Sequence, residues 1–190
     1  MLSVLEVKRK LPQVFVDNLY ELFSPLTVDK ILAGMAGERC TTLRVNTLKY
    51  DIQSLMRYLK ERNIKFERVP WYQEALIIKN ATEKELQKLD IFEKGCIYLQ
   101  SLSSMIPPLV LSPKAGERVL DLTAAPGSKT TQMAAMMQNK GSILANELDK
   151  IRCERLQYNV VQQGASIVTV NNGYGEKIGG KYPETFDKVL

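Results

Sequence analysis

The sequence contains no histidine among its 190 residues. Imidazole is the usual general base near neutral pH, and it is a frequent ligand of catalytic zinc. A Ser-His-Asp triad and most catalytic zinc sites are therefore excluded. We expect no metal site, and any chemistry of this chain must operate without imidazole.

Cysteine is also scarce, with only Cys40, Cys96 and Cys153 scattered along the chain. An odd number of separated cysteines argues against a disulfide framework. Long apolar runs are absent as well: no window approaches the 18 apolar residues of a membrane span. The first residues carry no charged leader followed by an apolar core, so they do not form a secretory signal. We therefore expect a cytoplasmic protein with no membrane partner, and a monomer by default.

What the sequence does contain is an ordinary globular mixture, 45% hydrophobic and 25% charged. Its formal net charge is +5. A basic balance favours polyanionic partners such as nucleic acid, although many basic proteins bind none.

The first 40 residues form a predicted N-terminal helical segment. Val14, Leu19, Leu22 and Phe23 recur at helical spacing within residues 13–35. A Ser-Pro-Leu sequence at 24–26 interrupts them, and a second helix is expected from residue 27 or 28 to residue 35.

Residues 41–100 show the pattern of a small α+β domain. Strands are expected at 41–46, 64–69, 75–78 and 96–99, and helices at 51–62 and 81–89. Thr82 and Glu85 have the spacing of a capping box at the start of the second helix. We interpret this segment as an RNA-binding type of domain whose sheet supports RNA.

Residues 101–190 alternate regularly between strands and helices. After a helix that leads towards Leu111, strands are expected at 118–122, 142–146, 166–170 and 186–190, with helices at 129–138 and 149–163. This alternation predicts a parallel sheet with right-handed crossovers. Because the fourth strand has only begun at Leu190, we expect the first half of a Rossmann-like core, with a truncated parallel sheet.

The stretch at 118–131 is the centre of this pattern: a short strand that contains Asp121, a turn of small residues, and a helix that starts at Lys129. Ligands of open parallel sheets bind outside the carboxyl ends of strands, at helix N-termini. The loop is neither a G-x-G-x-x-G fingerprint nor a phosphate-binding P-loop, since it has the single glycine Gly127. One glycine suits a ligand less charged than a pyrophosphate, and S-adenosylmethionine fits because backbone amides can hold its carboxylate.

A second acidic feature follows at the end of the next strand. An acidic residue 20 to 30 positions beyond such a loop commonly accepts a hydrogen bond from a ribose hydroxyl. Glu147 fits that place best, whereas Asp149 is expected to cap the next helix. By itself, Glu147 is equally explained as a solvated carboxylate in the first turn of a helix.

Three motifs resemble the Sun-type RNA (cytosine-5) methyltransferases. Residues 121–130 read DLTAAPGSKT, close to the family signature D-x-C/A-A-A-P-G-G/S-K-T. Residues 95–105 resemble its lead-in G-x-x-x-x-Q-x-x-S-S-M, and residues 44–47 resemble its R-x-N-T strand. The signature is specific, the motifs occur in the family order, and the resemblance spans roughly residues 10–190.

The resemblance implies S-adenosylmethionine as cofactor, held at its methionine end by Thr123, Ala124, Ala125, Pro126, Gly127, Ser128 and Lys129. It further implies that Glu147 holds the ribose and that Arg152 orders the same wall. Where the family has an aspartate that reaches the adenine side, this chain has Asn172. Lys129 has three open roles: contact with the cofactor's carboxylate, a cap on the loop, or a solvated first-turn lysine.

A nucleophile for carbon-5 methylation is not assigned within the chain. That reaction needs a thiolate that attacks carbon 6 of cytosine. In the family that cysteine and a second one lie in P-C and T-C motifs, which we expect beyond Leu190. Cys40 precedes a strand, Cys96 begins one and Cys153 lies on a helix, so each is interpreted as structural. No catalytic residue is therefore predicted in this chain.

RNA-contact candidates are Arg44 and Asn46 on the first strand of the small domain. Further basic residues are Lys49, Arg57, Lys60, Arg62, Lys65 and Arg68, and the aromatic candidates for base stacking are Trp71 and Tyr72. The alternative is a solvated basic face with Trp71 packed at a domain edge.

The sequence thus predicts the N-terminal portion of an S-adenosylmethionine-dependent RNA (cytosine-5) methyltransferase that acts on rRNA or tRNA, inactive by itself. The alternative is a non-catalytic RNA-binding protein that retains the methyltransferase fold.

Overall fold

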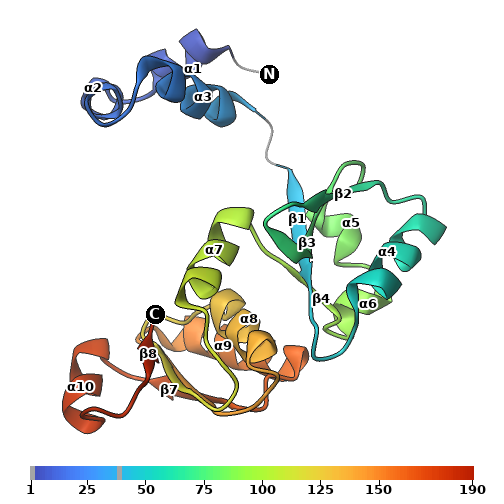
Figure 1. Ribbon diagram of the computed structural model, residues 1–190, viewed down its shortest axis with the longest axis vertical. Helices are drawn as coiled ribbons and strands as arrows, with labels where there is room; N and C mark the ends of the chain where they lie inside the picture. The colour runs from blue at the N-terminus through green and yellow to red at the C-terminus, as the bar shows by residue number, and fades with distance from the viewer. Residues whose placement is uncertain (1–2, 38–39) are drawn as a thin grey trace. The chain divides into compact units, whose positions relative to one another are not determined.

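The computed structural model describes residues 3–37 and 40–190 (Figure 1). It divides into two compact units, Met1–Cys40 and Thr41–Leu190. Within the described residues, no helix has the length and apolar character needed to cross a membrane.

The described residues of the first unit, 3–37 and 40, contain the helices α1 (Val4–Lys10), α2 (Gln13–Leu22) and α3 (Pro25–Ala36). Ser3 and Glu6 form a capping box on α1, and Ser24 caps α3 with Pro25 at the first position. Helix α1 was not predicted. Its capping box is present in the sequence, but its seven residues carry little periodicity.

The buried face of α2 also differs from the prediction. Val16 and Leu19 are buried, whereas Val14 is 71% and Leu22 73% exposed. Leu19 belongs to a core with Val28 and Leu32 of α3. The apolar residues of α2 outnumber those that one neighbouring helix can cover, so periodicity alone was right for Leu19 and wrong for Val14 and Leu22.

The second unit begins with an antiparallel sheet. Its elements are β1 (Thr41–Val45), α4 (Ile52–Glu61), β2 (Phe66–Val69), β3 (Tyr72–Ile78), α5 (Glu83–Leu86), α6 (Asp90–Glu93) and β4 (Ile97–Leu99). The strand order is β2-β3-β1-β4. Leu55 and Leu59 of α4 are fully buried in the core beneath this sheet.

Two boundaries in this region differ from the prediction. Strand β3 starts at Tyr72 rather than residue 75, because it continues through the hairpin to pair with β2. The helix expected over 81–89 ends at Leu86, and α6 follows as a separate turn. The capping box of Thr82 and Glu85 is confirmed.

The remainder of the unit contains the parallel sheet. Its elements are α7 (Leu102–Leu111), β5 (Arg118–Asp121), α8 (Ser128–Met136), β6 (Ser142–Glu147), α9 (Lys150–Gln163), β7 (Val168–Asn172), η1 (Gly175–Lys177), α10 (Ile178–Lys181) and β8 (Lys188–Val189). The strand order is β7-β6-β5-β8, and every pairing is parallel. The predicted parallel sheet is confirmed. Helical turns at 175–181 replace an expected loop.

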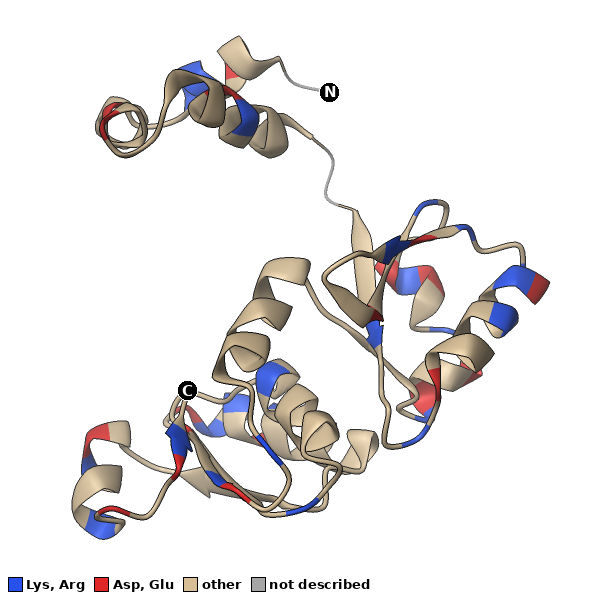
Figure 2. Ribbon diagram, in the orientation of Figure 1, with Lys and Arg blue, Asp and Glu red and all other residues tan. Residues whose placement is uncertain are grey.

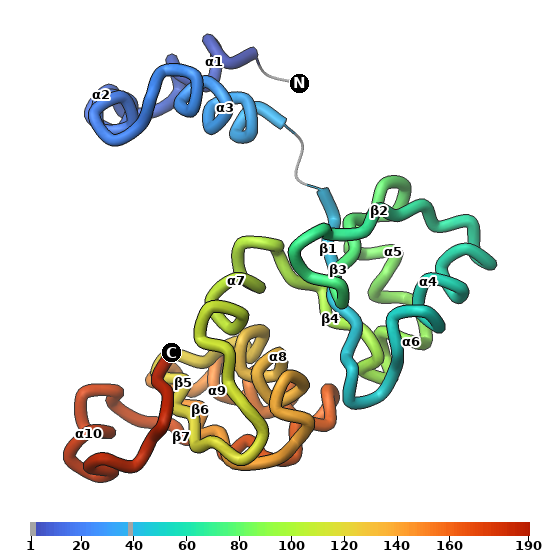
Figure 3. The backbone as a smooth tube through the Cα atoms, viewed as in Figure 1, coloured from blue at the N-terminus to red at the C-terminus, as the bar shows by residue number. Residues whose placement is uncertain are grey.

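The chain path places the carboxyl ends of β5, β6 and β7 side by side (Figure 3). Helices α8 and α9 pack against each other and against β6, so both cover one face of the sheet, as right-handed crossovers require. Their shared core includes Val119, Met133, Ile143 and Leu156. The loops after β5, β6 and β7 consequently meet at one edge.

Candidate functional site: the carboxyl edge of the parallel sheet

Asp121 ends β5 and is 3% exposed. Its carboxylate accepts a 2.6 Å hydrogen bond from Thr130 Oγ1 on the first turn of α8. Burial raises the pKa of Asp121, while the Thr130 bond and the charge of half-buried Lys129 oppose that rise. The bond between Asp121 and Thr130 thereby holds the end of β5 against the first turn of α8, on either side of the connecting loop.

The loop closes onto α8 through Gly127, which has φ +104°. An added Cβ there would lie 3.0 Å from Leu156 Cδ1 of α9, so glycine permits both the backbone and the close packing. No side chain caps α8 at this residue. The amides of its first turn are thus available to an anionic ligand.

Side chains of α9 hold the outer part of the loop. Arg152 Nη2 donates to the carbonyl of Ala125 at 2.9 Å, and Asn159 Nδ2 donates to that of Pro126 at 2.7 Å. Ala125 is buried, and its peptide bond to Pro126 is cis. Arg152 therefore links the loop to α9 by a hydrogen bond, and its role towards a cofactor stays a prediction.

Glu147 ends β6 and is 5% exposed. Its Oε1 accepts a bond from the amide of Asp149 at 3.1 Å. Its Oε2 is buried without a hydrogen-bond partner, and Arg152 Nη2 lies 3.7 Å away, too far for a hydrogen bond. One oxygen of this buried carboxylate thus accepts no hydrogen bond within the protein, although it forms an ion pair with Arg152, and it can accept one from a ligand. Asp149 caps α9, as predicted, by accepting from the amide of Arg152.

Asn172 ends β7 and is exposed. Its Nδ2 donates to the carbonyls of Glu147 and Leu148 at 2.8 and 2.9 Å. It lines a surface hollow together with Lys150, Cys153 and Val170. The loop 123–129, Glu147 and Asn172 therefore follow three neighbouring strands at one edge.

Asn146 is a site residue that the sequence analysis missed. It is 1% exposed, and its Nδ2 donates to the carbonyls of Leu122 and Gly173 at 3.1 Å each. Its Oδ1 accepts a bond from Asn171 at 2.7 Å. It thereby joins the loops after β5 and β7. Its place beside Glu147 at a strand end was the signal that could have revealed it.

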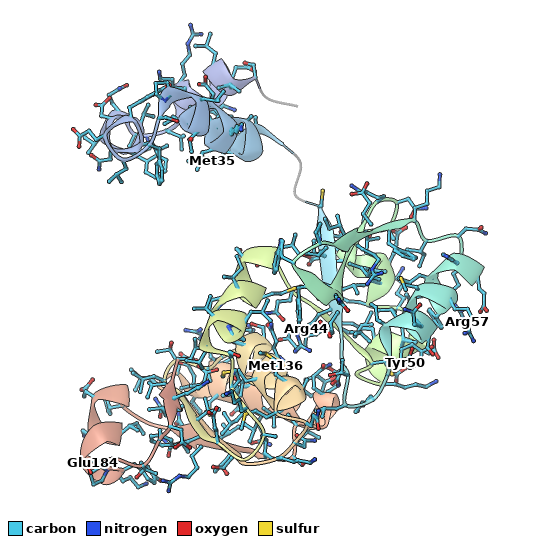
Figure 4. All side chains as sticks on the ribbon, viewed as in Figure 1. Met35, Arg44, Tyr50, Arg57, Met136 and Glu184 are labelled. Atoms are coloured by element: carbon cyan, nitrogen blue, oxygen red, sulfur yellow. The ribbon has the colours of Figure 1, made fainter. Side chains whose placement is uncertain are left out.

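Arg44 and Asn46 correct the prediction of RNA contact, because both are 1% exposed. Arg44 points from β1 towards α8 (Figure 4) and donates to Gln100 and Thr131. Asn46 Nδ2 donates to the carbonyls of Gly95 and Gln163. Both side chains make buried hydrogen bonds that join the antiparallel sheet to the region of the parallel sheet, so neither can reach RNA in this structure.

The other basic candidates all remain at the surface. The exposed residues Arg57, Lys60, Arg62, Lys65 and Arg68 lie on α4, on β2 and in the turn between them, and Figure 2 marks the Lys and Arg positions of this region in blue. Lys49 is exposed as well, but its Nζ donates to the carbonyls of Lys94 and Gln162. Trp71 is 49% exposed rather than packed at a domain edge.

Two of the three cysteines lie in surroundings that disfavour a nucleophilic role. Burial raises the thiol pKa of Cys96 and that of Cys153, which disfavours the reactive thiolate. Cys40 is exposed at the end of the first unit. Among residues 3–37 and 40–190, no group of three or more metal-ligating side chains forms a metal site.

Comparison with known proteins assigns this arrangement to a family. The family model "16S rRNA methyltransferase RsmB/F" matches residues 108–190, and "N-terminal domain of 16S rRNA methyltransferase RsmF" matches residues 11–102. The chain belongs to the Sun-type RNA methyltransferase family. Its Rossmann-like α/β core, preceded by a smaller α+β region, is the fold expected from the sequence.

Relatives of this Sun-type chain are named "Ribosomal RNA small subunit methyltransferase F". The one from Pectobacterium carotovorum is 36% identical over 95% of this chain and 38% of its own length. The one from Shewanella oneidensis is 39% identical over 90% of this chain and 36% of its own length. A crystallised methyltransferase homolog from Pyrococcus horikoshii is 32% identical with a TM-score of 0.86, covering 100% of this chain and 62% of that one. The chain thus spans less than two fifths of the length of the two relatives named "Ribosomal RNA small subunit methyltransferase F".

Proposed function

We propose that this chain forms the cofactor-binding part of an S-adenosylmethionine-dependent RNA (cytosine-5) methyltransferase that acts on rRNA. The observation that carries the proposal is the buried Oε2 of Glu147, which accepts no hydrogen bond, at the end of the strand next to the one that leads into the uncapped N-terminus of α8. Family membership supports RNA methylation as the reaction, and the names of the relatives support rRNA as the substrate.

The residues present fit S-adenosylmethionine. Its carboxylate is an anion, and the first-turn amides of α8 are donors without a side-chain cap. A ribose hydroxyl would supply the donor that Glu147 Oε2 lacks. The hollow beside Asn172 would take the adenine, with the amide of Asn172 in the role that an aspartate has in the family.

When bound, S-adenosylmethionine supplies an electrophilic methyl group. The residues of this chain bind and orient it. The loop residues Thr123, Ala124, Ala125, Pro126, Gly127, Ser128 and Lys129 surround its methionine end, while Glu147 holds the ribose. Arg152 keeps the loop against α9 through the carbonyl of Ala125. Binding before the reaction removes much of the entropic cost of bringing donor and base together.

For RNA, the exposed basic residues of α4 and β2 replace Arg44 and Asn46 as candidates. Arg57, Lys60, Arg62, Lys65 and Arg68 would contact phosphates, and exposed Trp71 would stack on a base. Arg62 already lies 3.6 Å above the ring of Tyr58, which orients its guanidinium.

Calorimetric titration of the chain with S-adenosylmethionine tests the proposal. We expect saturable binding that Glu147→Gln weakens about 10- to 100-fold, since a hydrogen bond to a charged group is lost. Glu83→Gln on α5 makes the same chemical change at an exposed carboxylate and should leave the affinity unchanged. Absence of binding by the unmodified chain would refute the cofactor assignment.

We further propose that the chain by itself transfers no methyl group, because burial disfavours the reactive thiolates of Cys96 and Cys153. Incubation with labelled S-adenosylmethionine and rRNA should leave the RNA unlabelled. Labelled RNA would contradict this. RNA binding without any cofactor affinity would instead favour a non-catalytic RNA-binding protein that retains the fold.

A further inference from the structure

Arg44 carries a buried positive charge without an anionic partner. It is 1% exposed, and among the residues that the structure describes no carboxylate forms an ion pair with it. Its oxygen contacts are neutral, and the face of Tyr98 lies 5.2 Å from its guanidinium carbon. Burial lowers the pKa of Arg44 to about 10, so it stays charged at neutral pH. Such a group is costly to bury, and its bonds show what it stabilises.

Those bonds lead to the loop before α8. Arg44 Nη2 donates to Thr131 Oγ1 at 2.7 Å and lies 3.4 Å from the carbonyl oxygen of Ser128. Thr131 Oγ1 donates in turn to the carbonyl of Gly127 at 2.7 Å. Strand β1 lies more than 80 residues earlier in the sequence. Through Arg44 it is linked to Gly127, the N-cap residue of α8, and to Ser128, the first residue of that helix.

The Nε side of the guanidinium binds Gln100, which lies just before α7. Arg44 Nε donates to Gln100 Oε1 at 2.9 Å, and Gln100 Nε2 donates to Gln132 Oε1 at 2.9 Å. Gln132 Nε2 continues to the carbonyl of Met105 at 3.0 Å. Every side chain in this row is buried, so the guanidinium has little freedom to move relative to α8.

We propose that Arg44 is a positioning residue for cofactor binding: it holds Gly127 and Ser128 in place through Thr131 and adds positive potential behind the first turn of α8. The proposal rests on the proposed function of the loop. A positive charge in a poorly solvated place acts over a longer range than one at the surface, and it favours a carboxylate at these amides. The planar fork of arginine makes both contacts at once, which a lysine cannot do.

The test compares Arg44→Met and Arg44→Lys with Asn46→Ala in the full chain. Asn46 directly follows the same strand, and its alanine variant loses two buried hydrogen bonds, which end at Gly95 and Gln163 rather than at the loop. Hydrogen exchange of amides 123–131 is measured without cofactor, and affinity for S-adenosylmethionine by calorimetry, both at a temperature where each variant is folded.

We expect faster exchange of the loop amides and about tenfold weaker binding in Arg44→Met, with Arg44→Lys between it and the unmodified chain. Asn46→Ala should change neither. Where Arg44→Met does not fold, Thr131→Val removes the same acceptor and the bond to Gly127, and it should give the same result. Equal effects of Arg44→Met and Asn46→Ala, or an unaltered loop in Arg44→Met, would overturn the proposal. If the unmodified chain binds no cofactor, the loop exchange still decides whether Arg44 positions the loop.

Discussion

Individual buried polar residues determine the shape of the candidate site. Thr130 bonds Asp121, Asn146 bonds two loops, and Thr131 connects Gly127 to Arg44. Each is surrounded by the apolar core, where an unmade hydrogen bond is costly. Substitution of one hydrogen-bond partner should therefore disturb the loop, because the other partner is left buried without a hydrogen bond.

Gly127 gives a direct test at this scale. Gly127→Ala places a residue with Cβ at φ +104° and presses it against Leu156. Gly116→Ala has nearly the same strain, at φ +95°, but meets no atom within 4 Å. Left-handed backbone costs alanine about 1–2 kcal/mol in both.

Gly127→Ala should lose a further ~1 kcal/mol or more through overpacking and should bind S-adenosylmethionine more weakly. Gly116→Ala should bind normally. Denaturant unfolding measures the unfolding free energy, and calorimetry measures the affinity. Equal losses of unfolding free energy in Gly127→Ala and Gly116→Ala would show that the side chain of Leu156 moves aside without an energetic penalty.

Single elements derive their stability from one buried face and from links to a neighbour. Helix α2 buries Val16 and Leu19, while α4 buries Leu55 and Leu59. Helix α4 is also linked to α6, because the hydroxyl of Tyr58 donates to Asp90, which pairs with Lys94 at 2.8 Å.

Val16 and Val14 separate the two possible faces of α2. Val16 is 1% exposed and Val14 is 71% exposed. Val16→Ala should lower the stability of the first unit by about 1–3 kcal/mol, whereas Val14→Ala should change it by less than about 0.5 kcal/mol. Hydrogen exchange of the α2 amides reports both, and the reverse order would favour the face predicted from periodicity.

The link between α4 and α6 predicts an acid-dependent stability. Bonds from Lys94 and Tyr58 lower the pKa of Asp90 from 3.8 to about 2. A carboxyl with a lowered folded-state pKa stabilises the fold above its unfolded pKa, and the contribution is lost as pH falls towards 2.

Asp90→Asn should therefore flatten the decline in unfolding free energy between about pH 4 and pH 2. The neighbouring exposed Glu93 provides the control, and Glu93→Gln should leave the decline in place. Acid titration followed by circular dichroism makes the comparison. An unchanged slope in Asp90→Asn would show that the bonds seen here do not survive in solution.

Over the whole second unit, the antiparallel sheet and the parallel sheet are joined by buried polar contacts. Asn46 and Lys49 donate to carbonyls of α9, and Gln163 donates to the carbonyl of Ile97. Gly95 fits against α9 so closely that a Cβ would lie 2.1 Å from the carbonyl oxygen of Gln162. We therefore expect residues 41–190 to unfold cooperatively.

Gly95→Ala tests this cooperativity. It should lower the stability of the second unit by about 2 kcal/mol more than Gly116→Ala, because backbone must move to admit the methyl group. The single tryptophan, Trp71, reports the antiparallel sheet by fluorescence, and hydrogen exchange of α9 reports the core. The two transitions should coincide in the unmodified chain and separate in Gly95→Ala. Separate transitions in the unmodified chain would disprove the expected coupling.

The sequence by itself determined the parallel α/β core, the strand-loop-helix at 118–131, and the placement of Glu147 at the end of the next strand. These features depend on patterns within about 30 residues, where periodicity, glycine and capping residues act directly on the backbone. The cofactor roles of these residues remain predictions.

Only the tertiary structure decided which polar residues are buried and what they join. Arg44 and Asn46 were interpreted as surface groups of a strand, yet each has a hydrogen-bond partner 84 or more positions away, on α8 and α9 respectively. Local sequence does not specify such distant partners, because they come together only when the two sheets pack. Packing within the first unit likewise selected Val16 over Val14 on α2, and burial at the end of β6 left Oε2 of Glu147 without a hydrogen-bond donor.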